Sequence, residues 1–200
     1  MLISKGASVA TADNLGRTAL HLACERGAQA NVFTQFVTEC FTEGQAGDAI
    51  NAVTNNGCTP LHYASYYNRG YYIVCLLEHG AKLEARNNAG QTPLHMVGLK
   101  ISKVRSGEEG RAISDDLGDT AVASDAMEVE NDYDSDEGLP YAVSDDNVYL
   151  ELLKQGADIT ARDNMGNLPF FLAAATEWLE ATFEILRLGA VQGLFEKNHR

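Results

Sequence analysis

Apolar residues recur along this chain at helical spacing, in short segments that polar turns separate. Amphipathic segments near residues 74–77, 148–153 and 183–186 are each followed by a glycine, which suits the left-handed residue that ends many helices. These glycines are Gly80, Gly156 and Gly189. The pattern predicts little or no strand and helices near residues 19–26, 29–43, 60–67, 71–78, 93–100, 147–154, 169–176 and 179–187.

One hexapeptide occurs three times, as Thr18-Ala-Leu-His-Leu-Ala23, Thr59-Pro-Leu-His-Tyr-Ala64 and Thr92-Pro-Leu-His-Met-Val97. The second and third copies begin 33 residues apart. The threonine suits a helix N-cap, and the proline after it suits the first helical position. The leucine of each copy should then point into a core. A degraded fourth copy begins at Leu168, where leucine replaces the threonine.

The hexapeptide and its period resemble the ankyrin repeat, whose unit is a β-turn followed by two helices. The resemblance implies an all-α solenoid, because one such unit cannot bury its apolar face alone. We expect the chain to start halfway through a repeat, as a fragment or an incomplete gene sequence would. The expected units are a partial repeat at 1–17, repeats at 18–58, 59–91 and 92–167, and a degenerate capping repeat with a tail at 168–200.

The repeat at 92–167 is interrupted by an acidic insert at about residues 101–146. The insert holds 14 of the 28 acidic residues and 3 of the 15 Lys and Arg, so it carries −11 of the net charge of −13. We expect disorder there because it has few bulky apolar residues to bury. It is either a solvated loop or a contact for a basic partner. The calcium-loop pattern at residues 132–136 fails, since Val143 stands where a bidentate Glu is required.

The sequence predicts no catalytic, cofactor or metal site, because it lacks a phosphate loop, a nucleophile elbow and zinc-ligand spacing. The recurring His21, His62 and His95 are interpreted as a structural hydrogen bond. Four unpaired cysteines predict a reducing intracellular setting, cytoplasmic or nuclear. The acidic charge disfavours nucleic acid. We expect no membrane contact and a monomer.

The resemblance implies that another protein binds to the hairpin tips and the concave face of the first helices. The residues expected there are Arg17, Glu25, Arg26, Asn55, Asn56, Tyr66, Tyr67, Asn88, Gln91, Leu99 and Lys100. Tyr66 and Tyr67 either reach the open face as contacts or pack against the long helix of the first repeat. The leading function is therefore an intracellular adaptor or scaffold. The alternative is a regulatory element in which the acidic insert binds a basic partner or acts as a phosphorylation-tunable tether.

Overall fold

The computed structural model describes residues 8–27, 29–42, 49–97 and 148–169. Its helices are α1 (Ala19–Arg26), α2 (Ala30–Thr42), α4 (Pro60–Tyr66), α5 (Gly70–Glu78) and α8 (Val148–Lys154), and residues 93–97 are also helical. Within these ranges the only β interaction is an isolated bridge between Ala12 and Thr18. The predicted all-α fold is confirmed. The acidic insert and, apart from Pro169, the helices predicted after residue 168 lie outside the described residues.

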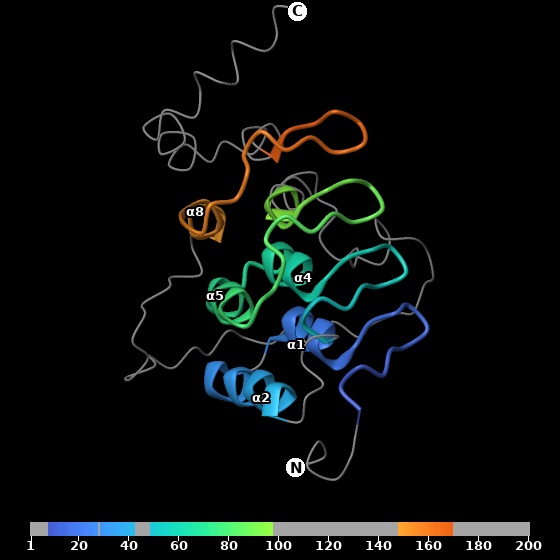
Figure 1. The fold of residues 1–200 in the computed structure, drawn as a ribbon, viewed down its shortest axis with the longest axis vertical. Coiled ribbons are helices and arrows are strands. Elements are labelled where there is room, and N and C mark those ends of the chain that lie inside the picture. Colours follow the sequence, from blue (N-terminus) through green and yellow to red (C-terminus); the bar gives the residue numbers. More distant parts are fainter. Residues whose placement is uncertain (1–7, 28, 43–48, 98–147, 170–200) are drawn as a thin grey trace, which may run out of the picture.

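The helices stack in two columns (Figure 1). The first-helix column contains α1, α4 and the helix at residues 93–97, and the second-helix column contains α2, α5 and α8. Helix α4 contacts both α1 and α5, and α5 also contacts α2 and α8. Hairpin loops project beside the first-helix column. This arrangement is the predicted solenoid of stacked helix pairs.

The apolar core lies between the two columns. The hexapeptide leucines Leu20, Leu61 and Leu94 are fully buried in it, as the sequence predicts. The second helices contribute residues such as Ile73 and Tyr149, and a stack of the Phe33 and Tyr72 rings joins α2 to α5. Burial of such side chains is the main source of stability in repeats that bury little surface alone.

A threonine and a histidine fix the start of each first helix. Thr18 and Thr59 are N-caps in an extended conformation, and each forms a capping box with the histidine three residues later. In all three copies the threonine N–H donates to the histidine Nδ1 at 3.1 Å. The box therefore satisfies backbone donors that a helix start leaves without an intrahelical partner.

The other ring nitrogen of each histidine joins one repeat to the next. Nε2 lies 3.0–3.2 Å from the backbone carbonyl that ends the hairpin before the next first helix, in the pairs His21–Cys58, His62–Gln91 and His95–Asn167. Because a carbonyl can only accept, Nε2 carries the proton and Nδ1 accepts from the threonine. Burial lowers the pKa of His21 and His62 to about 4, which keeps the rings neutral. These contacts confirm the predicted structural role.

Candidate protein-binding surface

Four hairpins of one design form the projecting edge of the stack, at residues 13–17, 54–58, 87–91 and 163–167. In each hairpin the N–H of the first residue donates to the carbonyl of the fifth, at 2.9–3.0 Å. The fourth residue is always a glycine with φ between 75° and 83°, in the region that L side chains avoid. The glycines are Gly16, Gly57, Gly90 and Gly166.

A side-chain oxygen closes each hairpin from the inside. The carboxylates of Asp13 and Asp163 and the amide of Asn87 each accept two backbone N–H groups of their own hairpin, at 2.8–3.0 Å. Burial opposes ionisation of the two acids, but these hydrogen bonds outweigh it and lower the pKa of Asp13 and Asp163. The tips are therefore held in one shape by bonds within each hairpin.

Asparagines at the second hairpin position connect the tips to one another. The backbone N–H of Asn55, Asn88 and Asn164 donates at 2.9 Å to a carbonyl at the tip of the preceding hairpin. The side-chain Nδ2 of each donates at 2.9–3.0 Å to the carbonyl of the preceding asparagine, which makes Asn14 the first member. We call this series the asparagine ladder. It holds four exposed tips in line.

An ion-pair network braces the first hairpin against α1. The Arg17 guanidinium donates to Asp13 at 2.8 Å and to Glu25 at 3.0 Å. Burial works against the charged guanidinium, but the two carboxylates raise the pKa of Arg17. Arg26 is exposed in the last turn of α1, where a cation interacts favourably with the helix dipole. The structure thus brings Arg17, Glu25 and Arg26 to one end of the predicted surface.

Comparisons with known proteins agree with this geometry. Residues 56–88 match the family model described as "Ankyrin repeat", over a range that includes α4 and α5. Residues 56–88 are therefore similar to an ankyrin repeat, and the neighbouring helix pairs and hairpins are built in the same way. Over 95 residues, or 48% of the chain, it is 32% identical to human "Transient receptor potential cation channel subfamily A member 1" and 33% identical to "Ankyrin repeat protein OPG189" of Variola virus. These matches span only 8% and 16% of the two relatives' lengths.

The ankyrin hairpins expose some of the predicted contact residues and partly cover others. Asn55 and Asn88 are exposed, whereas Asn56 and Gln91 are half-buried. Leu99 and Lys100 lie outside the described residues. The ladder was not predicted from sequence, although all four hairpins carry its signal, an asparagine two residues before the glycine. Whether these residues contact a partner stays a prediction.

The tyrosines of the second ankyrin repeat require a correction. Tyr66 was expected to reach the open face, but only 7% of it is exposed, and its ring packs edge-on against Tyr67 at 5.2 Å. Tyr67 is half-buried against the core, and burial raises the pKa of its hydroxyl. Tyr66 therefore lies in the core rather than on the open face, and whether Tyr67 contacts a partner stays a prediction.

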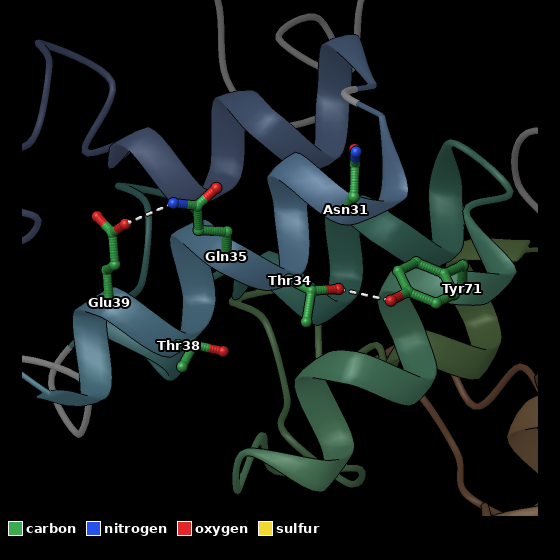
Figure 2. A pocket seen from close by; sticks show the side chains of 6 residues that line it. All are labelled: Asn31, Thr34, Gln35, Thr38, Glu39 and Tyr71. Atoms are coloured by element: carbon green, nitrogen blue, oxygen red, sulfur yellow. Dashed lines mark hydrogen bonds between the residues drawn. The ribbon is translucent and has the colours of Figure 1, made fainter. Parts of the chain in front are cut away.

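A shallow groove of about 410 Å³ lies on the opposite, second-helix side of the ankyrin stack, between α2 and α5 (Figure 2). Its lining residues are Asn31, Thr34, Gln35, Thr38, Glu39 and Tyr71. Thr34 is hydrogen-bonded to Tyr71, and Gln35 to Glu39, so polar side chains across and along the groove are already paired with one another. The groove has no arrangement that favours a particular ligand.

The reactive side chains of the described ankyrin units are in structural positions. Cys24, Cys40, Cys58 and Cys75 are buried and form no disulfide, and Cys24, Cys58 and Cys75 belong to the main apolar core. Burial raises the pKa of the Cys58 and Cys75 thiols to about 11, so both stay protonated and unreactive. Within the described ranges no three His, Cys, Asp or Glu side chains are grouped to hold a metal. No helix there is long and apolar enough to cross a bilayer.

Proposed function

We propose that this chain is a protein-interaction module that binds a partner through its hairpin tips and the adjoining first-helix face. Ankyrin repeats generally bind other proteins, and one of the two relatives is itself named an ankyrin repeat protein. The reduced, buried cysteines support an intracellular adaptor or scaffold role, in the cytoplasm or the nucleus.

The observation that carries the proposal is where apolar side chains remain exposed. In the described ranges three large apolar residues are exposed: Val32 at 49%, Val53 at 57% and Met165 at 88%. Two of them, Val53 and Met165, lie in or next to hairpins that the asparagine ladder holds in place. Exposed apolar groups on a pre-organised polar edge can be buried by a partner at a low entropic cost.

The proposed role is binding rather than catalysis. The histidine trio, which is the most suggestive set of catalytic groups in the sequence, is buried and committed to capping and to the repeat junctions. A general base needs a free nitrogen within reach of a substrate, and these rings have both nitrogens engaged. Nucleic acid is also disfavoured, since the chain carries a net charge of −13.

Two matched valine substitutions test the proposed surface. Val53→Asp places a charge beside the second hairpin, and Val32→Asp makes the same change at a similarly exposed site on α2. Partners captured by the wild-type chain are identified by mass spectrometry, and their affinity is then measured by calorimetry with purified partner. We expect Val53→Asp to weaken binding roughly tenfold or more and Val32→Asp to leave it unchanged.

Equal affinity of the two variants would contradict the assignment of the hairpin edge. Binding that survives Val53→Asp but is lost when residues 106–144 are deleted would favour the acidic-insert alternative. Circular dichroism must show that both valine variants keep the helical content of the wild-type chain. This condition separates loss of a contact from loss of the fold.

A further inference from the structure

An asparagine followed directly by a glycine occurs at one place in the sequence, Asn56–Gly57, and aspartate followed by glycine does not occur. The pair lies in the hairpin at residues 54–58, where Gly57 has a φ of 76°. An asparagine side chain can cyclise onto the backbone nitrogen that follows it. Glycine crowds this nitrogen least, because it has no Cβ and adopts conformations that other residues avoid. The hairpin at residues 54–58 therefore carries a chemically reactive pair that the other three hairpins lack.

Fewer side-chain bonds close this hairpin than close the others. In each of the other three, the first residue accepts two backbone N–H groups of its own hairpin; these residues are Asp13, Asn87 and Asp163. Thr54 takes this position in the hairpin at residues 54–58, and among the described residues its Oγ1 accepts only the N–H of Cys58, at 3.2 Å. We therefore expect this hairpin to open locally more often than its neighbours.

The peptide group between Asn56 and Gly57 is hydrogen-bonded at both of its polar ends. Its N–H donates to the Thr54 carbonyl at 2.8 Å, and its carbonyl accepts the N–H of Asn88 at 2.9 Å. Cyclisation requires Cγ of Asn56 to approach the Gly57 nitrogen, so the peptide group must rotate and the nitrogen must lose its proton. Both hydrogen bonds oppose this movement. The reaction therefore has to wait until the hairpin opens.

We propose that Asn56 is a site of spontaneous deamidation, that opening of the hairpin at residues 54–58 controls its rate, and that its isoaspartate product uncouples this hairpin from the next. The deprotonated nitrogen of Gly57 forms a bond to Cγ of Asn56, the bond from Cγ to the side-chain nitrogen breaks, and ammonia leaves. Water then opens the succinimide ring. Attack at Cγ gives aspartate, and attack at the backbone carbonyl gives isoaspartate. The inference is independent of the proposed partner contact.

The two products differ in the path of the chain. Aspartate keeps the backbone carbonyl to which the N–H of Asn88 donates. In isoaspartate the chain runs through Cβ and Cγ, which places one more carbon before the Gly57 nitrogen. The hairpin has no room for it, because Thr54 and Cys58 are joined at 2.9 Å and a Cβ at Gly57 would already come within 2.6 Å of Asn88. Isoaspartate should therefore break the bonds between this hairpin and Asn88.

Peptide mapping of the full chain by mass spectrometry, sampled over time in mildly alkaline native buffer, tests the site. Asn56 should gain one mass unit faster than Asn51 and Asn88, each of which precedes an alanine. Asn56→Gln should leave that peptide unchanged, because glutamine would have to form a larger ring. In urea the reaction at Asn56 should run roughly tenfold faster or more, because the two hydrogen bonds no longer hold the peptide group.

Two threonine variants test whether hairpin opening controls the rate. Thr54→Val removes the hydroxyl that accepts from Cys58, whereas Thr160→Val removes a hydroxyl that is bonded to Asp158 at 2.6 Å and lies outside this hairpin. In native buffer we expect Asn56 to deamidate several-fold faster in Thr54→Val than in wild type, and at the wild-type rate in Thr160→Val. In urea all three chains should react at one rate, which separates hairpin opening from intrinsic reactivity.

The two products of Asn56 provide a matched comparison, because they have the same mass and the same charge. After chromatographic separation, the isoaspartate form should unfold at a urea concentration about 1 M lower than the aspartate form. The genetically made Asn56→Asp should unfold at the urea concentration of the wild type.

Three results would overturn the proposal. If Asn56 in the native chain does not deamidate, or does so no faster than Asn88, the site is wrong. If the rates in native buffer and in urea are equal, the hairpin does not control the reaction. If the two product forms unfold at the same urea concentration, isoaspartate does not uncouple the hairpins. Should Thr54→Val fail to fold, the comparison of native buffer with urea decides the question of control alone.

Discussion

Replacing His62 with phenylalanine tests the chemistry that joins the central repeats. The ring Nε2 donates to the Gln91 carbonyl at 3.1 Å, and Nδ1 accepts from Thr59 at 3.1 Å. Phenylalanine keeps the ring but leaves that carbonyl and that N–H without their partner. Each of these two buried groups costs about 1–3 kcal/mol when left unsatisfied, so His62→Phe should lower the free energy of unfolding at pH 7 by about 2–6 kcal/mol.

The same substitution should change how stability depends on pH. The pKa of His62 is lowered from 6.5 to about 4 by burial, so the unfolded chain takes up the proton first as the pH falls. The stabilisation from His62 is therefore complete above pH 6.5 and is lost as the pH falls toward 4. A shift of this size corresponds to about 3 kcal/mol, and the phenylalanine variant has no such group to titrate. The difference between wild type and variant should therefore shrink by about that amount between pH 7 and pH 4.

Urea unfolding followed by circular dichroism at several pH values between 4 and 7 measures both effects. Groups common to the two proteins contribute equally and largely cancel in the difference. His79→Phe is the control, since His79 lies half-buried at the end of α5 and outside the repeat junctions; we expect a smaller loss of stability there. If the difference in free energy of unfolding between wild type and His62→Phe is constant across this pH range, the conclusion that His62 is buried in its neutral form would be wrong.

Two further predictions concern the backbone of the stack. Gly57→Ala should lower the free energy of unfolding by at least about 1 kcal/mol more than Gly80→Ala: both glycines have positive φ, but only at Gly57 does the new Cβ come within 2.6 Å of Asn88. If urea unfolding shows equal losses of stability for the two variants, the strain of a side chain at positive φ would account for both, and the contact with Asn88 would contribute nothing. Excision of residues 104–146, with Lys103 joined to Asn147 by a short Gly/Ser link, should leave the melting temperature nearly unchanged, since each doubling of a loop costs only about 0.6 kcal/mol. A melting temperature lowered by many degrees would mean that the insert packs on the stack.

The sequence predicted the helices well because their boundaries are encoded locally. A threonine cap marks the start of each first helix, and in the second and third copies a proline stands at the first helical position. Helix α1 was predicted with its observed bounds at Ala19–Arg26. Helix α5 begins one residue before the prediction, at Gly70, and α4 ends one residue before it, at Tyr66. These differences are of the size by which frayed helix ends vary.

The parts of the surface that sequence did not predict depend on neighbouring repeats. Spacing placed Tyr66 at a helix end but could not show that Tyr67 and the core cover it. Asn55 and Asn88 were predicted as separate contact residues, yet they are also links of one ladder, because each bonds to a hairpin 33 or more residues earlier. The pairing of Asn164 with Asn88 crosses 76 residues and could be inferred only from the period.

In the third repeat, the contacts of the first and second helices with neighbouring repeats are kept although a long segment of chain separates the two helices. Its first helix ends in the described residues at position 97, and its second helix, α8, begins at Val148. His95 nevertheless reaches Asn167 with the same geometry that His62 has toward Gln91, and α8 contacts α5. The forces that position each helix therefore come from the adjacent repeats and not from the connection between the two helices. The described junctions lie on both sides of that connection and do not include it, so we expect extra sequence there to cost the solenoid little stability.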